Sequence, residues 1–100
     1  MESHQVIVEV FKKFCDALNR EDGASFEALT VHDVNPQTDV FLANSQQLKQ
    51  SRMELRIKRI DQEGDVAEVF FDLIGADGVS EDEGMLTMTQ EADTWRIRSL

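Results

Sequence analysis

The stretch RMELRIKRIDQEGDVAEVFFDLIGADGVSEDEGMLTMTQEADTWRIRSL, residues 52–100, decides the fold of this chain. Apolar and polar side chains alternate in three runs, at residues 53–58, 67–74 and 95–100, and in a shorter fourth run at residues 86–89. Side chains alternate between the two faces of a β-strand, so each run predicts one strand. This alternation is typical of half-buried antiparallel sheets, whereas buried parallel strands read as continuous apolar runs.

Short segments rich in turn residues separate these runs. Residues 61–65 contain Gly64, which adopts positive φ at little cost and suits a hairpin loop. Residues 75–84 predict a longer loop that its acidic side chains keep in water, and residues 91–94 close the last hairpin. Connections of this length predict a meander, in which Lys58 and Glu68 form a favourable cross-strand pair.

The first half of the chain predicts helices that cover one face of this sheet. Apolar residues recur at intervals of three and four through residues 5–20, the pattern of an amphipathic helix laid on a core. Gly23 ends this helix, and Asp22 or Ser25 caps a short second helix that carries Phe26.

Residues 31–43 are less regular. Pro36 restricts the residue before it to an extended conformation and predicts that no helix forms here. Residues 40–42 predict a short strand or edge segment, and a capping-box pattern that begins at Asn44 predicts a third short helix through Gln50. Helices segregated from an antiparallel sheet define an α+β fold.

Length and composition exclude several classes of protein. One hundred residues predict a single domain over residues 1–100, with a core that needs no metal or disulfide staple. The net charge of -10 argues against binding to the phosphate backbone of nucleic acid. No apolar run approaches the roughly 20 residues that span a membrane. The N-terminus lacks the pattern of a signal peptide, and Cys15 is the only cysteine, so we expect a cytoplasmic protein.

Four segments carry a resemblance to a known family. Residues 10–22, VFKKFCDALNRED, look like its opening helix and the end of that helix, and residues 26–29, FEAL, look like its second helix. Residues 64–69, GDVAEV, and 93–97, DTWRI, resemble its hairpin and its closing strand. The chain thus resembles the nuclear-transport-factor-like superfamily, also called cystatin-like α+β, which includes steroid-isomerase-like members. The resemblance implies a cone, in which a curved antiparallel sheet of three to five strands wraps around a long N-terminal helix, with two short helices beside it.

A cone of this kind implies a ligand pocket between the first helix and the sheet. The side chains expected to line it are Phe11, Phe14, Cys15, Leu18, Val69, Phe71, Trp95 and Ile97. The same aromatic side chains also suit an ordinary core, and the sequence leaves both possibilities open. A cysteine beside the core stripe of a helix is more often a small buried hydrophobe than a nucleophile.

Catalytic candidates follow the second helix. His32 and Asp33 are adjacent, and Asp39 is a substitute for Asp33; an imidazole and a carboxylate suit proton transfer beside a carbonyl. Neighbours in an extended segment point to opposite sides, so the alternative is a solvated turn. The chain contains no tyrosine and therefore lacks the phenolic oxyanion donor of the steroid-isomerase-like members.

The sequence predicts no metal and no cofactor. Two histidines and one cysteine lack the spacing of zinc ligands. Residues 77–83 are acidic but lack the spacing of a calcium-binding loop, so they read as a solvated loop.

The sequence leaves three functions open, because a fold of this kind hosts many activities. We favour a non-enzymatic domain that forms a homodimer and binds a small apolar molecule in the cone. The alternatives are a small isomerase, dehydratase or cyclase that uses His32, Asp33 or Asp39, and a protein–protein adaptor whose cone is filled.

The homodimer hypothesis rests on the outer face of the predicted sheet. Phe70 and Ile74 alternate with the inward residues of their strand and are expected to face outward. Two large apolar groups on one strand form a patch that needs cover, and a two-fold interface would place the same patch on both subunits. The remaining residues expected at this interface are Met85, Thr87, Arg56 and Arg96.

Overall fold

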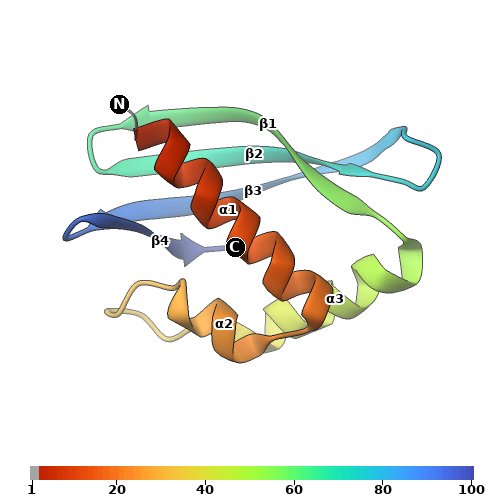
Figure 1. The fold of residues 1–100 in the computed structure, drawn as a ribbon, viewed down its shortest axis with the longest axis horizontal. Helices are drawn as coiled ribbons and strands as arrows, with labels where there is room; N and C mark the ends of the chain where they lie inside the picture. Colours follow the sequence, from red (N-terminus) through yellow and green to blue (C-terminus); the bar gives the residue numbers. More distant parts are fainter. Residues whose placement is uncertain (1–2) are drawn as a thin grey trace.

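The structure, a computed structural model that describes residues 3–100, folds the second half of the chain into a four-stranded antiparallel sheet (Figure 1). The strands follow one another in space in the order of the sequence. They are β1 (Glu54–Glu63), β2 (Val66–Ile74), β3 (Ser80–Glu91) and β4 (Thr94–Ser99). The predicted α+β class and the antiparallel meander are therefore confirmed.

Strand β3 is longer than the alternation predicts. It begins at Ser80, inside the stretch that the sequence assigns to a loop, and Asp82 pairs with Leu73 of β2. Backbone groups pair irrespective of side-chain charge, so an acidic stretch can follow the neighbouring strand while its side chains stay in water. The connection between β2 and β3 shrinks to residues 75–79.

The predicted pair between Lys58 and Glu68 is wrong. The register between β1 and β2 shifts after Ile57, and Asp61 lies opposite Glu68. Lys58 sits at this bulge, and its Nζ lies 2.6 Å from Oε2 of Glu83 on β3. A bulge adds one residue to a strand, which moves every later pairing by one position.

Helix α1 (Ser3–Arg20) crosses the inner face of the sheet diagonally (Figure 1). Its apolar stripe turns toward the sheet and is buried, as the spacing predicts. Phe11 of this stripe meets Phe71 of β2 with ring centroids 5.6 Å apart. The core therefore lies between α1 and the sheet, and it contains Ile7, Val10, Phe14, Ala17, Leu18, Val69, Trp95 and Ile97.

Helix α2 (Gly23–Ala28) is short and begins where the sequence predicts. The backbone N–H of Ser25 donates to Oδ1 of Asp22 at 3.1 Å, and the Ser25 hydroxyl donates to Oδ2 at 2.7 Å. This cap satisfies a backbone donor that the first turn of a helix leaves free. Phe26 is the buried anchor of the helix.

Helix α3 (Thr38–Ser51) corrects the prediction for this region in two places. Residues 40–42 are helical and not a strand, and the helix starts after Gln37 and not at Asn44. Pro36 lies before the helix, where its ring breaks no helical hydrogen bond. The buried face of α3 contains Phe41 and Ser45, and a serine within the stripe interrupts the apolar period.

The segment between α2 and α3 closes one edge of the sheet. Val31 N–H donates to the Ile97 carbonyl at 2.9 Å, and Ile97 N–H donates to the Leu29 carbonyl at 2.7 Å. Thr30 thereby forms a parallel bridge with β4. Covering an edge strand satisfies its free backbone groups.

Candidate functional site

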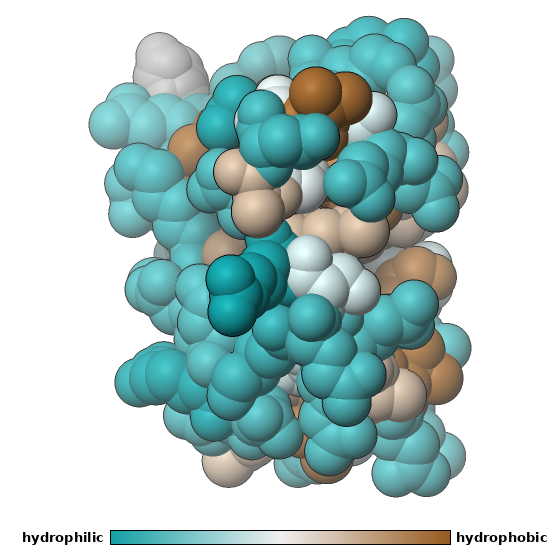
Figure 2. Space-filling view, turned by 90° about the vertical axis from the view of Figure 1, so that its right-hand side faces the viewer, coloured by the Kyte–Doolittle hydropathy of each residue, from teal (hydrophilic) through white to brown (hydrophobic). Residues whose placement is uncertain are grey.

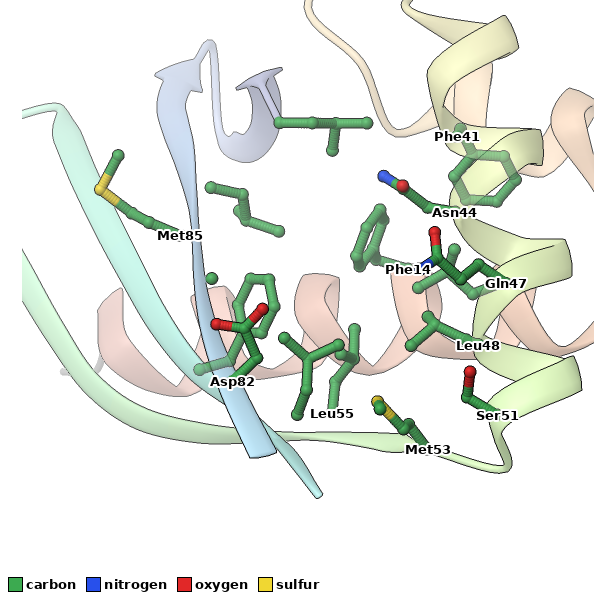
Figure 3. A pocket seen from close by; sticks show the side chains of 16 residues that line it. Phe14, Phe41, Asn44, Gln47, Leu48, Ser51, Met53, Leu55, Asp82 and Met85 are labelled. Carbon is green, nitrogen blue, oxygen red and sulfur yellow. The ribbon is translucent and has the colours of Figure 1, made fainter. Parts of the chain in front are cut away.

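A pocket of 360 Å³ opens between α3 and the inner face of the sheet (Figure 3). This volume falls near the lower end of the range for small-molecule sites, about 300–1,000 Å³. Helices α1 and α3 and strands β1, β2 and β3 all contribute side chains. The lining consists of Phe14, Leu18, Phe41, Asn44, Gln47, Leu48, Ser51, Met53, Leu55, Phe71, Leu73, Asp82, Gly84, Met85, Leu86 and Leu100.

Helix α3 supplies one wall of the pocket. Its lining residues fall at positions 41, 44, 47, 48 and 51, a spacing of three and four that places them on one helix face. In Figure 3, Asn44 and Gln47 project from this helix toward the sheet. Had residues 40–42 formed the predicted strand, Phe41 would not share a helix face with Asn44 and Gln47.

The buried side chains of Phe41 and Ser45 hold α3 in this position. The Phe41 ring stacks on Phe26 with centroids 4.3 Å apart and meets Phe14 edge-on at 5.9 Å. The buried Ser45 hydroxyl donates to the Leu18 carbonyl of α1. Since this bond satisfies the hydroxyl, a polar residue is tolerated inside the core.

The opposite wall is the inner face of the sheet. Leu55, Leu73 and Phe71 lie on this face, and Phe71 pairs with Gly84 of β3. A Cβ atom at Gly84 would lie 2.5 Å from Cε1 and Cζ of Phe71. Because Gly84 has no side chain, the Phe71 ring has room to lie across β3.

The mouth of the pocket is polar. Its four polar lining residues, Asn44, Gln47, Ser51 and Asp82, are all exposed. Figure 2 shows this side of the molecule, which hydrophilic residues largely cover, with smaller pale and brown areas between them. The pocket thus combines apolar walls with a polar rim.

Met85 borders the pocket without entering it. In Figure 3 its side chain lies on the far side of β3 from α3, and 42% of it is exposed. Met85 pairs with Phe70, whose side chain belongs to the outer face. Met85 is therefore part of the outer face of the sheet.

Three of the eight predicted pocket residues line this pocket, namely Phe14, Leu18 and Phe71. The other five do not line it, and four of them are buried in the core: Phe11, Val69, Trp95 and Ile97. Side chains fill the cone beneath α1, so the space lies toward α3. The sequence prediction missed this wall because it placed the pocket between the first helix and the sheet, and because a helix that begins at Asn44 excludes Phe41.

Cys15 packs against the core and is half-buried. Burial, with a smaller contribution from the neighbouring Asp16 carboxylate, raises the pKa of its thiol to about 11. The thiolate is the nucleophilic form of cysteine. At neutral pH Cys15 is a thiol, and this supports its reading as a buried hydrophobe.

The three catalytic candidates lie outside the pocket lining. Nδ1 of His32 lies 3.0 Å from Oε1 of Glu91, and Oδ2 of Asp33 lies 3.4 Å from Nη2 of Arg98. Asp39 is exposed in the first turn of α3. His32 and Asp33 therefore link the segment before α3 to the hairpin of β3 and β4.

The outer face of the sheet carries an apolar patch. We define the outer-face patch as Val66, Phe70 and Met85; Glu68 and its partner Thr87 lie between Val66 and the pair of Phe70 and Met85. Val66 and Met85 are 41% and 42% exposed. Phe70 is half-buried because Cζ of Arg59 lies 4.3 Å from its ring centroid. Sequence reasoning missed this cation–π contact.

Three interface predictions need correction or refinement. Ile74 is 6% exposed and does not extend the patch, because the register shifts between Leu73 and Ile74 at the end of β2. Arg96 is bound within its own chain, to Oε1 of Glu91 at 3.1 Å and to the Ala28 carbonyl at 2.6 Å. The guanidinium of Arg56 lies 3.2 Å from its neighbour Glu54 and stays exposed.

Two further features bear on the class of protein. Within residues 3–100, no three His, Cys, Asp or Glu side chains are grouped so that they would hold a metal ion. None of the helices in the same part of the chain is long and apolar enough to cross a membrane.

Comparison with known proteins identifies the fold. No protein-family model matches the sequence, and no curated protein matches it. A solved chain named as a variant of Rd1NTF2 superposes with a TM-score of 0.72 at 11% identity, covering 97% of this chain and 96% of its own. This chain has the NTF2-like fold.

Two natural NTF2-like proteins show the same arrangement. An NTF-2-like protein of unknown function from Silicibacter pomeroyi DSS-3 has a TM-score of 0.66 and 17% identity, with 97% of this chain and 93% of that chain covered. A candidate NTF2-like transpeptidase from Campylobacter jejuni also has a TM-score of 0.66, at 13% identity, with 92% and 97% covered. At these identities, the shared NTF2-like fold does not show that the proteins share an activity.

Proposed function

We propose that this chain is a small non-enzymatic domain that binds a small, largely apolar molecule in the pocket between α3 and the sheet. The observation that carries the proposal is the pocket itself, 360 Å³ with apolar walls and a polar mouth. Small-molecule sites of proteins commonly combine apolar walls with a few polar groups.

The positions of the titratable groups favour binding over catalysis. His32, Asp33 and Asp39 do not line the pocket, and among the described residues Asp82 supplies the only titratable side chain of the lining. General acid–base catalysis needs a group within hydrogen-bond reach of the reacting atom. Within the described part of the chain, Ser51 supplies the one lining hydroxyl, and no imidazole lines the pocket to activate it as a nucleophile.

The same pocket weighs against an adaptor whose cone is filled. Core side chains fill the space beneath α1, but the space beside α3 is open. A filled cone would leave no such opening, whereas an apolar hollow that several elements line is typical of a small-molecule site.

The test is binding of a neutral fluorescent dye, N-phenyl-1-naphthylamine, to the native chain. We expect saturable binding that 1-octanol displaces. Gln47 projects into the pocket mouth, so Gln47→Trp should weaken dye binding about tenfold or more, a loss of about 1.4 kcal/mol. Gln50→Trp is the matched control, since Gln50 is an exposed glutamine of the same helix outside the lining. Absence of saturable binding to the folded native chain would refute the proposal.

We further propose that the chain forms a homodimer through the outer-face patch. The helices pack on the inner side of the sheet, as Figure 1 shows for α1, and no described element covers the outer face. An isologous interface would pair the patch of one subunit with that of the other and remove Val66 and Met85 from water.

Light scattering coupled to gel filtration tests the dimer. The native chain should run near twice 11.4 kDa, and Phe70→Glu should give a folded monomer. Val79→Glu is the control, because Val79 is 58% exposed at the β2–β3 connection, away from the patch. A native monomer at micromolar concentration would end the dimer hypothesis.

A further inference from the structure

We propose that the pocket prefers cationic amphiphiles, molecules with an apolar tail and a protonated amine at one end. The tail would lie against the apolar walls, and the ammonium group would lie at the mouth beside Asp82. This inference rests on the proposed binding function and adds the charge of the ligand to it.

Asp82 stands at the right place for such a contact. It pairs with Leu73, an inner-face residue of β2, and it lines the pocket mouth on the side that faces α3 (Figure 3). Its Oδ1 accepts the backbone N–H of Glu83 at 2.8 Å. Among the described residues, no lysine, arginine or histidine lies within ion-pair distance of its carboxylate.

The neighbouring acids on the sheet differ from Asp82 because they do not line the pocket. Glu83 on the outer face is paired with Lys58, and Asp72 accepts a hydrogen bond from the Ser80 hydroxyl at 3.3 Å. Among the described side chains, Asp82 is therefore the carboxylate that a ligand in the pocket would meet.

The side chains of the other described lining residues add no charge. Asn44, Gln47 and Ser51 are neutral and offer hydrogen bonds on the opposite side of the mouth. Arg52 follows Ser51 in the chain, but it is exposed and does not line the pocket. A ligand carboxylate would meet the like charge of Asp82, which disfavours anionic amphiphiles of the same length.

The expected size of the preference follows from the exposure of Asp82. Ion pairs in contact with water are weak, so the ammonium group should improve affinity by at most about fivefold. Apolar burial of the tail should supply most of the affinity, and charge should decide among ligands of equal tail length.

Three ligands with the same tail test the inference: octylamine, 1-octanol and sodium octanoate, each used to displace N-phenyl-1-naphthylamine at pH 7 and low salt. For the native chain we expect octylamine to bind up to about fivefold tighter than 1-octanol, and octanoate to bind more weakly than both. Asp82→Asn should remove the difference between the amine and the alcohol. Asp93→Asn removes the same formal charge in the β3–β4 turn, away from the pocket, and should leave the difference intact.

The outcomes separate this inference from the binding function. If 1-octanol displaces the dye but octylamine binds no better, or if Asp82→Asn keeps the preference, the role of Asp82 is refuted and the binding function stands. If neither the dye nor any octyl compound binds the folded chain, both proposals fail. If Asp93→Asn abolishes the preference for the amine as fully as Asp82→Asn does, the preference arises from the net charge of the chain, and the role of Asp82 is refuted.

Discussion

Replacing Gly84 by alanine tests whether the Phe71 ring forms the pocket wall. The added Cβ would lie 2.5 Å from Cε1 and Cζ of Phe71 and 3.4 Å from its Cδ1. Carbon atoms pack at about 3.5–4.0 Å, so the ring has to move by about 1 Å. Phe11 packs against the Phe71 ring with centroids 5.6 Å apart, and the free side of the ring is the pocket.

We expect Gly84→Ala to lower the free energy of unfolding by about 1–3 kcal/mol, the usual cost of overpacking. The displaced ring should also narrow the pocket and weaken dye binding. Urea unfolding followed by circular dichroism measures the first effect, and dye titration measures the second.

A double-mutant cycle assigns this cost to the Phe71 ring. Phe71→Leu removes the ring atoms that the new Cβ would meet, so Gly84→Ala should cost less in that background, with a coupling energy of about 0.5–3 kcal/mol in magnitude. Gly64→Ala is the control: Gly64 has a φ of 61° and no atom within 4 Å of its Cβ position. Its cost comes from left-handed backbone alone and should be additive with Phe71→Leu within about 0.5 kcal/mol. Additivity of Gly84→Ala with Phe71→Leu would refute the placement of the ring.

Three further predictions follow from the fold. Phe14→Ala should cost about 3–5 kcal/mol in denaturant melts, since Phe14 is buried between α1 and α3, and a loss below about 1 kcal/mol would place it outside the core. His32→Ala should change the free energy of unfolding by less than about 0.5 kcal/mol and leave dye affinity unchanged. Loss of dye binding by a folded His32→Ala chain would show that His32 belongs to the binding site. For Cys15, stability should fall as pH rises from 9.0 to about 11, because the unfolded thiol ionises while the folded thiol keeps its proton, and Cys15→Ala should lessen this fall. An identical pH dependence in the variant would contradict the raised pKa of Cys15.

The sequence alone determined those elements whose patterns are local. The stripe of α1 and the alternation of β2 predict buried residues such as Phe11 and Val69, because the direction of a side chain along a helix or strand follows from its spacing. The cap of α2 is equally local, since Asp22 and Ser25 lie three residues apart. The NTF2-like fold could be inferred from these elements and their order.

Tertiary contacts decided where the pocket lies. Residues 40–42 favour a strand by composition, but Phe41 stacks on Phe26 and contacts Phe14 only when they are helical. Ser45 interrupts the apolar stripe of α3, and its partner is the carbonyl of Leu18, 27 residues away. Neither contact can be predicted from the residue pattern of a short stretch of sequence.

Strand register decided which charged groups lie together. The bulge after Ile57 moves Lys58 from its expected partner Glu68 to Glu83, and the extension of β3 brings Asp82 beside Leu73 at the pocket mouth. Register depends on pairing between segments far apart in the chain, and a shift of one residue turns a side chain to the other face. The local periodicity of this sequence therefore determines its helices and strands, whereas packing between distant residues determines the pocket and the groups that line it.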